Sequence, residues 1–312
     1  MQSTNVFART AMGGLVLLGL GVTPAAQGRV EKNVVYGMYS GSALLLDVHY
    51  PAQPNGFGIV FIAGSGWNAP LGYGAVPLKE SPQVGMYVPS LTQVGYTVFA
   101  VTHRATPAFR FPAPLEDAQR AVRFIRHNAA KYGIDAARIG GSGGSSGAHL
   151  VSMLATMDGT GDPSDSDAVN RESAKLQCVV ARAAPIDLLR MNPSLGAGAL
   201  ALLLGANVTE ATPKASAEYK AAWAASPINY VSKDDAPMLL VHGDADRTVP
   251  FSQSEMMEAA LRKMSVPVKL IRIEGGDHGP TFTGAKNPPD YKAAMVNWFD
   301  EHLRGVSPSS NR

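Results

Sequence analysis

The stretch from Arg138 to Leu150 constrains the fold of this chain more than any other. It contains Gly143-Gly144-Ser145-Ser146-Gly147, a G-x-S-x-G pattern, directly before a helix expected over 148–157. A serine on a sharp strand-to-helix turn has a strained backbone, and side chains two residues before or after it would clash. The pattern therefore predicts a short strand, a tight turn that exposes the Ser145 hydroxyl, and a helix whose positive end points at that hydroxyl.

The register of this turn has an alternative. Gly140-Gly141-Ser142-Gly143-Gly144 fits the same pattern, and a Gly-Ser-rich segment can also be a simple flexible loop. We interpret Ser145 as the exposed serine because it directly precedes the helical run. Ser142 falls where the strand should still be running. Partner residues elsewhere in the chain have to decide between these interpretations.

The bulk properties predict one large α/β domain. The chain has 312 residues, of which 46% are hydrophobic and 17% charged, with a net charge of +2. This length is enough for a sizeable core. No basic run or aromatic-basic pattern is present, which argues against a nucleic-acid partner. Cys178 is the single cysteine, so an internal disulfide and a multi-cysteine metal site are excluded.

The N-terminus is typical of a secretory signal peptide. Arg9 provides a positive charge, residues 11–22 are apolar, and 23–27 contain small residues suited to cleavage. The apolar run is shorter than the roughly 20 residues that span a bilayer. We therefore expect residues 1–26 to be removed and the mature chain, without a membrane span, to be secreted or periplasmic. An uncleaved anchor or a disordered tail is the alternative.

The rest of the chain alternates between apolar strand-like runs and helical patterns. Strands are expected as a hairpin within 34–50, over 58–63 and 97–101, before the turn at 145, and over 176–184, 237–242 and 268–273; helices are expected over 87–94, from 111–114 to 133, and over 148–157, 252–264 and 291–303. This alternation predicts a doubly wound, mostly parallel sheet. We assign residues 32–304 to this one domain.

Residues 186–234 interrupt the alternation. They contain helix-like stretches near 200–204 and 217–225 but no clear strand. We interpret the segment as a small helical cap inserted over the site. It could instead be the helical part of one more β-α unit.

Polar or glycine-rich residues follow four of the expected strands. Ser145, Asp246, His278 and the loop 64–67 each come directly after an apolar run. In doubly wound sheets, ligands bind beyond the carboxyl ends of the strands. We therefore expect these groups to face one crevice.

A serine, a carboxylate and a histidine in one crevice suggest nucleophilic catalysis. A serine hydroxyl needs a base, and the pKa of histidine suits it to that role. The histidine in turn needs a carboxylate that fixes its tautomer. His149 and His242 are the other histidines considered for the base, and Asp244 and Asp277 the other candidates for the acid.

Taken together, these motifs resemble the α/β-hydrolase superfamily, in particular its esterase/lipase group. The likeness covers roughly residues 32–304 and is nearest to secreted acetylxylan and feruloyl esterases and to hormone-sensitive-lipase-like carboxylesterases. Its chain order is serine, acid, histidine. The motifs that carry it are Gly143-Gly144-Ser145-Ser146-Gly147-Ala148-His149-Leu150, His242-Gly243-Asp244-Ala245-Asp246-Arg247-Thr248-Val249-Pro250 and Gly275-Gly276-Asp277-His278-Gly279.

The resemblance assigns the roles. The acid of the family stands three residues before Val-Pro, which is Asp246 here, and leaves Asp244 a structural role. Asp277 adjoins His278, and a sequence neighbour rarely reaches the ring nitrogen. The family's equivalent of His149 is not the base, and His242 lies within a strand, where a core or hydrogen-bonding role is expected.

The loop Gly64-Ser65-Gly66-Trp67 resembles the His-Gly-Gly-Gly-Trp loop of the family, with Ala63 in place of the histidine and Ser65 in place of a glycine. Acyl transfer needs hydrogen-bond donors for the oxyanion. The resemblance implies that the backbone amides of Ser65, Gly66 and Ser146 supply them. An ordinary β-α turn is the alternative for this loop.

The expected function is that of a serine carboxylesterase. It would hydrolyse short-chain or carbohydrate-linked esters through an acyl-enzyme, with a small-molecule or polysaccharide ester as substrate and with no cofactor and no metal. A prolyl-oligopeptidase-like serine peptidase and an inactive hydrolase-fold binding protein are the alternatives. A dinucleotide site is disfavoured because the last glycine of G-x-G-x-x-G is missing after Gly141.

Overall fold

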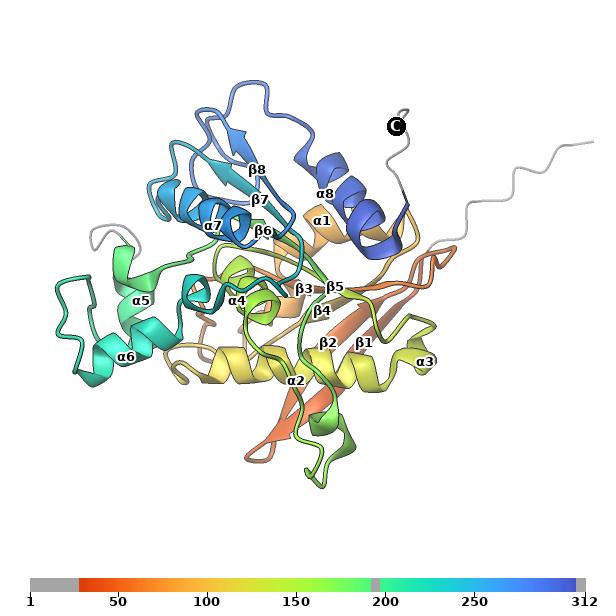
Figure 1. Cartoon of the computed structure of the whole chain (residues 1–312). Helices are drawn as coiled ribbons and strands as arrows, with labels where there is room; N and C mark the ends of the chain where they lie inside the picture. The colour runs from red at the N-terminus through yellow and green to blue at the C-terminus, as the bar shows by residue number, and fades with distance from the viewer. Residues whose placement is uncertain (1–27, 192–196, 307–312) are drawn as a thin grey trace, which may run out of the picture.

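A single eight-stranded sheet organises the computed structural model, which describes residues 28–191 and 197–306 (Figure 1). The predicted signal segment 1–26 lies outside the described residues. The strand order is β1-β2-β4-β3-β5-β6-β7-β8. The strands are β1 (Val30–Tyr39), β2 (Ser42–His49), β3 (Gly58–Ile62), β4 (Thr97–Val101), β5 (Ile139–Gly144), β6 (Cys178–Arg182), β7 (Met238–Gly243) and β8 (Val268–Ile273).

The sheet is mostly parallel, which confirms the predicted fold class. β1 pairs with β2 and β2 with β4 in antiparallel fashion, and every later pair from β3 to β8 is parallel. The predicted hairpin is β1–β2. β3 and β4 are buried along their whole length, as expected for apolar strands that helices cover on both faces.

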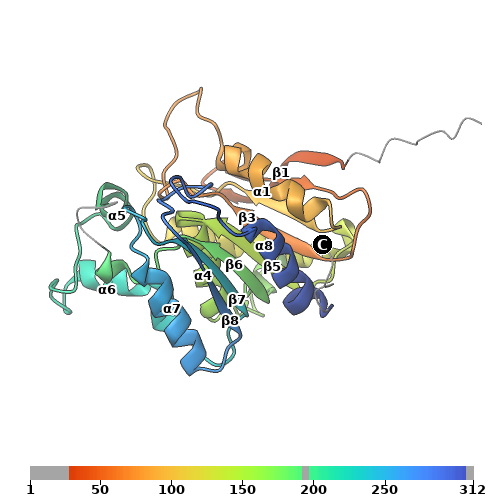
Figure 2. The same cartoon turned by 90° about the horizontal axis from the view of Figure 1, so that it is seen from above.

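Helices cover both faces of the sheet (Figures 1 and 2). On one face α1 (Pro82–Thr92) and α8 (Tyr291–Phe299) pack, and a π-helical turn over Asp300–Arg304 continues α8. On the other face lie α2 (Ala113–His127), α4 (Ser146–Thr156) and α7 (Ser252–Lys263), with the short α3 (Ala129–Tyr132) after α2. The sheet therefore separates two hydrophobic cores.

Helix α1 begins five residues before its predicted start at 87. Ser81 is its N-cap, with a hydroxyl that accepts the Gln83 amide at 3.4 Å, and Pro82 occupies the first turn, where a missing amide costs nothing. The predicted start is too late because the prediction rests on the apolar pattern alone, which does not include these capping residues. The extra turn places Gln83 beside the loop after β3.

The described residues of 186–234, the predicted cap, include two short helices between β6 and β7. They are α5 (Ala197–Leu204) and α6 (Ala217–Ala224), with 3-10 turns at Leu188–Arg190 and Pro227–Tyr230. The Leu203 carbonyl oxygen accepts the Phe111 amide at 2.9 Å, which ties α5 to the segment before α2. Within the described parts of the chain, no helix is long and apolar enough to cross a membrane.

The turn between β5 and α4 packs against the end of β3 with no room for side chains. A Cβ on Gly147 would lie 2.0 Å from the Ile62 carbonyl oxygen, and one on Gly143 would lie 2.5 Å from the Gly147 carbonyl carbon. Both obstacles are backbone atoms, which cannot move aside as a flexible side chain can. Glycine at these two positions is therefore a packing requirement.

Replacing Gly147 with alanine should destabilise the protein severely. The added methyl group overlaps backbone, so Gly147→Ala should cost about 3 kcal/mol or more in unfolding free energy, or prevent folding. Gly85→Ala is the matched control, because a Cβ on Gly85 meets nothing within 4 Å and the residue lies in α1. That variant should be neutral or stabilising by about 0.5–1 kcal/mol. Urea unfolding measures both, and a Gly147→Ala protein as stable as Gly85→Ala would contradict the packing argument.

Candidate active site

Ser145 occupies the turn between β5 and α4 in a strained conformation. Its φ is 51° and its ψ −122°, a combination rarely adopted by residues other than glycine. Its amide donates to the Arg182 carbonyl oxygen at 2.8 Å, and its own carbonyl oxygen accepts the His149 amide at 2.9 Å. These bonds fix the turn from both sides. Ser142 instead lies fully buried inside β5, with its Oγ 3.7 Å from the Met295 sulfur, so Ser145 is the serine on the turn.

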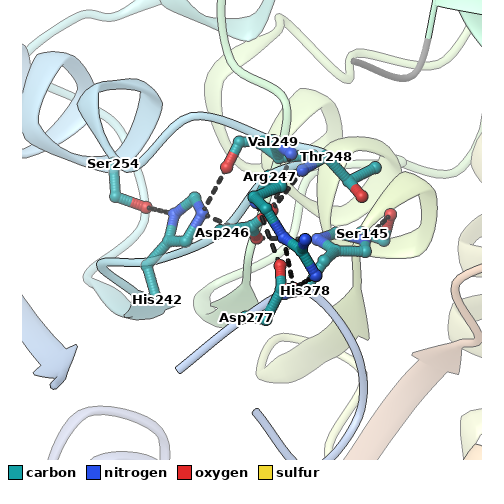
Figure 3. A network of polar contacts seen from close by, with 9 residues as sticks. All are labelled: Ser145, His242, Asp246, Arg247, Thr248, Val249, Ser254, Asp277 and His278. Atoms are coloured by element: carbon teal, nitrogen blue, oxygen red, sulfur yellow. Dashed lines mark hydrogen bonds and ion pairs between the residues drawn. The ribbon is translucent and has the colours of Figure 1, made fainter. Parts of the chain in front are cut away.

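Ser145, His278 and Asp246 form a continuous chain of hydrogen bonds (Figure 3). The Nε2 of His278 lies 3.0 Å from the Ser145 Oγ, and its Nδ1 lies 2.7 Å from the Asp246 Oδ2. An ionised carboxylate only accepts hydrogen bonds, so Nδ1 carries the proton and Nε2 is free to accept the serine proton. The structure thus brings the three predicted residues together from three separate strand ends.

Asp246 is held ionised by hydrogen bonds. Its Oδ1 accepts the amides of Thr248 and Val249, both at 2.8 Å, and its side chain is buried. Burial raises the pKa of Asp246, but the hydrogen bonds from His242 and His278 outweigh it, so the pKa lies well below its ordinary value. The carboxylate therefore stays negative behind His278.

His242 braces Asp246 from behind. Its Nε2 lies 3.2 Å from the Asp246 Oδ2 and 3.0 Å from the Val249 carbonyl oxygen, and its Nδ1 lies 2.7 Å from the Ser254 Oγ. Two acceptors face Nε2, so Nε2 carries the proton and Nδ1 accepts from the hydroxyl of Ser254. The expected hydrogen-bonding role is observed, and His242 has no contact with Ser145 among the described interactions.

The two other candidate acids are bound elsewhere. Asp244 accepts from the Arg272 Nε and from the Gly275 amide, both at 2.7 Å. Asp277 pairs with Arg247, which lowers the pKa of Asp277 to about 2, and it accepts the amide of His278 rather than a ring nitrogen. Both aspartates fix the loops that carry the site, while neither contacts the His278 ring in the described interactions.

The three predicted oxyanion donors differ in availability. The Ser65 amide is already bonded to the Ser146 Oγ at 2.9 Å. The amides of Gly66 and Ser146 have no acceptor among the described residues. Gln83 holds the same loop by accepting the Gly64 amide at 3.2 Å and donating to the Gly64 carbonyl oxygen at 3.0 Å. Two of the three amides thus remain unpaired, and their role stays a prediction.

A buried histidine connects this loop to the segment after β6. The Trp67 Nε1 donates to His149 Nδ1 at 3.1 Å, so the Nε2 of His149 carries the proton and donates to the Ala225 carbonyl oxygen at 2.7 Å. His149 is fully buried, and burial lowers its pKa to about 4. As expected, it takes no part in the contacts of Ser145 with His278. Its neutral ring joins α4, the loop after β3 and α6.

A pocket of about 320 Å³ opens at Ser145 and His278. Its lining comes from the ends of β3, β5 and β6, from α1 and from the loops after β7 and β8, and consists of Gly64, Ser65, Gly66, Gln83, Gly144, Ser145, Arg182, Ala183, Thr248, His278, Gly279 and Pro280. None of the described residues of 186–234 lines it, so the capping role of that segment stays a prediction. No group of His, Cys, Asp or Glu suited to a metal ion occurs in the described chain.

Residues 46–261 match the model of the BD-FAE family, which is more than half of the chain. The chain belongs to the BD-FAE family. The match includes Ser145 and Asp246, whereas His278 follows it. The sequence resemblance to α/β-hydrolase esterases is thereby confirmed.

Several proteins similar to this chain are esterases by name. Esterase LipQ of Mycobacterium tuberculosis is 28% identical over 59% of this chain and 42% of its own length, so the chain spans less than half of that protein. A truncated carbohydrate esterase from gut microbiota superposes with a TM-score of 0.73 at 28% identity, over 90% of this chain and 99% of the other. An acetyl ester-xyloside bifunctional hydrolase from Caldicellulosiruptor lactoaceticus gives 0.72 at 25% identity, over 92% and 100%.

Several residues of the site were not predicted as part of it. The sequence pattern places Arg182 in an apolar strand and gives it no role. A charged residue at the end of a buried strand is nevertheless unusual and can indicate a functional site. Gln83 fell outside the predicted helix. The bond from the Ser65 amide to the Ser146 hydroxyl joins residues 81 positions apart, and no local pattern indicates it.

The neutral His149 predicts a pH-dependent stability. In the unfolded chain the pKa of His149 is about 6.5, so below that pH the unfolded state binds a proton that the folded state does not. Above pH 6.5 the folded protein therefore has its full stability, and it loses stability as the pH falls toward about 4. His149→Gln can keep both hydrogen bonds without titrating. The difference in unfolding free energy between wild type and His149→Gln should therefore shift by roughly 3 kcal/mol against wild type between pH 7 and pH 4. Urea unfolding at each pH measures it, and a constant difference would refute a lowered pKa.

Proposed function

We propose that this protein is a serine carboxylesterase that hydrolyses short-chain or carbohydrate-linked esters through an acyl-enzyme intermediate. The observation that carries the proposal is the chain of hydrogen bonds from the Ser145 Oγ through the His278 ring to Asp246. The same arrangement of groups performs acyl transfer on unrelated folds. The esterases among the relatives support the same reaction class.

In the first half of the proposed reaction, Ser145 attacks the ester carbonyl carbon and His278 Nε2 takes the hydroxyl proton. The carbonyl oxygen becomes an oxyanion, which the free amides of Gly66 and Ser146 stabilise. His278 then gives its proton to the leaving alkoxide, and an alcohol departs. Asp246 stays ionised throughout and stabilises the imidazolium form of His278.

In the second half, water attacks the acyl-Ser145 ester. His278 removes a proton from the water, a second oxyanion forms, and the proton returns to the Ser145 Oγ as the carboxylic acid leaves. The Ser65 amide donates to the Ser146 hydroxyl in the free enzyme. We propose that Ser65 chiefly shapes the loop, with Gly66 and Ser146 as the main donors.

The pocket supports a short acyl or small alcohol group. Its volume of about 320 Å³ lies at the lower end of the range for small-molecule sites. Two of the structural relatives are named as a carbohydrate esterase and an acetyl ester-xyloside hydrolase. An acetyl ester on a carbohydrate is therefore the substrate that we propose first. We also propose, from residues 1–26, that the chain is exported.

Ser145→Ala should abolish ester hydrolysis. Removal of the nucleophile lowers kcat by about 10⁴-fold or more in comparable sites. The assay is hydrolysis of p-nitrophenyl acetate, butyrate and octanoate, together with acetate release from acetylated xylan. Ser142→Ala is the matched control, because Ser142 is buried in β5, and it should keep activity within about threefold of wild type.

The rates on the three p-nitrophenyl esters and on acetylated xylan then show which substrate the enzyme prefers. Acetate should be the best acyl group, and octanoate the poorest. Full activity in Ser145→Ala would overturn the nucleophile assignment. Wild-type protein that cleaves none of these esters would overturn the esterase proposal and favour a peptidase or an inactive binding protein.

Asp246→Asn should lower kcat by about 10⁴-fold while the protein stays folded, because an amide no longer fixes the tautomer of His278 or stabilises its charged form. Asp244→Asn is the matched control, because it keeps the shape of the side chain and removes only an ion pair with the exposed Arg272. Such a pair contributes little to stability, so the kcat of this variant should change less than about threefold. Steady-state kinetics with p-nitrophenyl acetate compare the two. Equal losses in both variants would show that the loop as a whole, rather than Asp246, matters.

A further inference from the structure

Arg182, the last residue of β6, places a buried cation in the wall of the pocket. Only 3% of the residue is exposed, and it is among the residues that line the pocket. Its Cζ lies 3.5 Å from the centre of the Tyr87 ring, which stacks on the guanidinium. Its Nε and Nη2 are buried and have no hydrogen-bond partner among the described residues. No carboxylate of the described chain forms an ion pair with it.

The other buried cations of the described residues have hydrogen-bond partners. Lys79 pairs with Asp47 at 2.9 Å and Arg104 with Asp117 at 2.7 Å, whereas Arg126 donates to backbone carbonyl oxygens. Burying a charge is costly unless it is paired and hydrogen-bonded. The cation-π contact with Tyr87 offsets part of that cost. Arg182 therefore keeps donors that nothing in the described protein satisfies.

The guanidinium is fixed close to the nucleophile. The Arg182 carbonyl oxygen accepts the Ser145 amide at 2.8 Å, so the two residues cannot move apart without breaking the turn. A Cβ placed on Gly144, the residue before Ser145, would lie 3.1 Å from the Arg182 Nη2. Only a glycine at 144 leaves this space open. Ser145 and Arg182 both line the pocket, so a ligand bound to Ser145 lies beside the Arg182 side chain.

The charge of the pocket is unbalanced. Its lining contains no Asp or Glu, and Arg182 is the one lining residue that is charged at every physiological pH. Asp246 is buried behind His278, and Arg247, outside the lining, is already paired with Asp277. A planar guanidinium with free donors matches the geometry of a carboxylate.

We propose that Arg182 binds a carboxylate of the substrate, so that the enzyme prefers esters with a negative charge close to the scissile bond. The inference rests on the proposed esterase function and narrows its substrate class to acidic esters. The carboxylate belongs to either the acyl or the alcohol half of the ester. The bound anion completes the hydrogen bonds that the Arg182 side chain lacks in the free protein.

The test compares charged esters with neutral amide isosteres. Monomethyl succinate and methyl succinamate place the group on the acyl half, and 4-acetoxybenzoate and 4-acetoxybenzamide place it on the alcohol half. For each pair, the ratio of kcat/KM for the charged ester to that for the amide is measured by acid release. Wild type should give a ratio of about 10 or more in one pair, the order expected for a hydrogen bond to a charged group. That pair identifies the half that Arg182 binds.

Arg182→Met should lower the ratio in that pair by about tenfold, since methionine fills the space beside Tyr87 without charge or donors. Arg182→Lys keeps a charge but not the planar fork, so its ratio should be intermediate. Lys292→Met is the control, because Lys292 lies 5.4 Å from the same Tyr87 ring but does not line the pocket. Its ratio should stay within about twofold of wild type.

The outcomes separate the two proposals. Wild-type ratios of one or less in both pairs, with the neutral esters still hydrolysed, would overturn the role of Arg182 and leave the esterase function intact. Loss of preference in Lys292→Met as large as in Arg182→Met would also overturn it. Wild type that hydrolyses none of the four esters would contradict the esterase function itself. If Arg182→Met fails to fold, the wild-type ratios and Arg182→Lys still decide.

Discussion

The close packing of the turn at Ser145 on the end of β3 fixes the position of the serine around which the rest of the site is arranged. Gly147 rests on the Ile62 carbonyl group with no space for a methyl group, and Gly143 rests on the backbone of Gly147. This contact forces Ser145 into its strained conformation. The hydrogen bond from the Ser145 amide to the Arg182 carbonyl oxygen then holds that conformation in place. The strain is compensated by the surrounding sheet, which holds the hydroxyl beyond the strand ends.

The polar groups of the site form two supports on opposite sides of Ser145. On one side, Ser254, His242 and Asp246 bond in series and fix the His278 ring. On the other side, Gln83 and the Ser146 hydroxyl hold the loop after β3, which His149 ties to α6 through Trp67. Negative charge is buried behind His278 at Asp246, and positive charge lies in the wall of the pocket at Arg182.

Much of this structure could be predicted from the sequence. Apolar runs and helical spacing predict the sheet, the hairpin and α4. The spacing of the glycines indicates Ser145, and the order of the motifs along the chain indicates Asp246 and His278. The start of α1 could not be predicted from apolar spacing, because a hydrogen bond from the Gln83 amide to Ser81 and a proline set it. The environment of Arg182 and the bond from Ser65 to Ser146 depend on contacts between distant residues. Such contacts follow from the folded sheet and leave no local signal.

The most direct test of the account is to label the folded protein with a fluorophosphonate and to map the modified peptide by mass spectrometry. A fluorophosphonate reacts with a serine only when a neighbouring base activates it. The account predicts a single adduct at Ser145, and none after the protein has been heat-denatured. An adduct at Ser142, or a folded protein that remains unlabelled, would contradict the claim that Ser145 is an activated nucleophile.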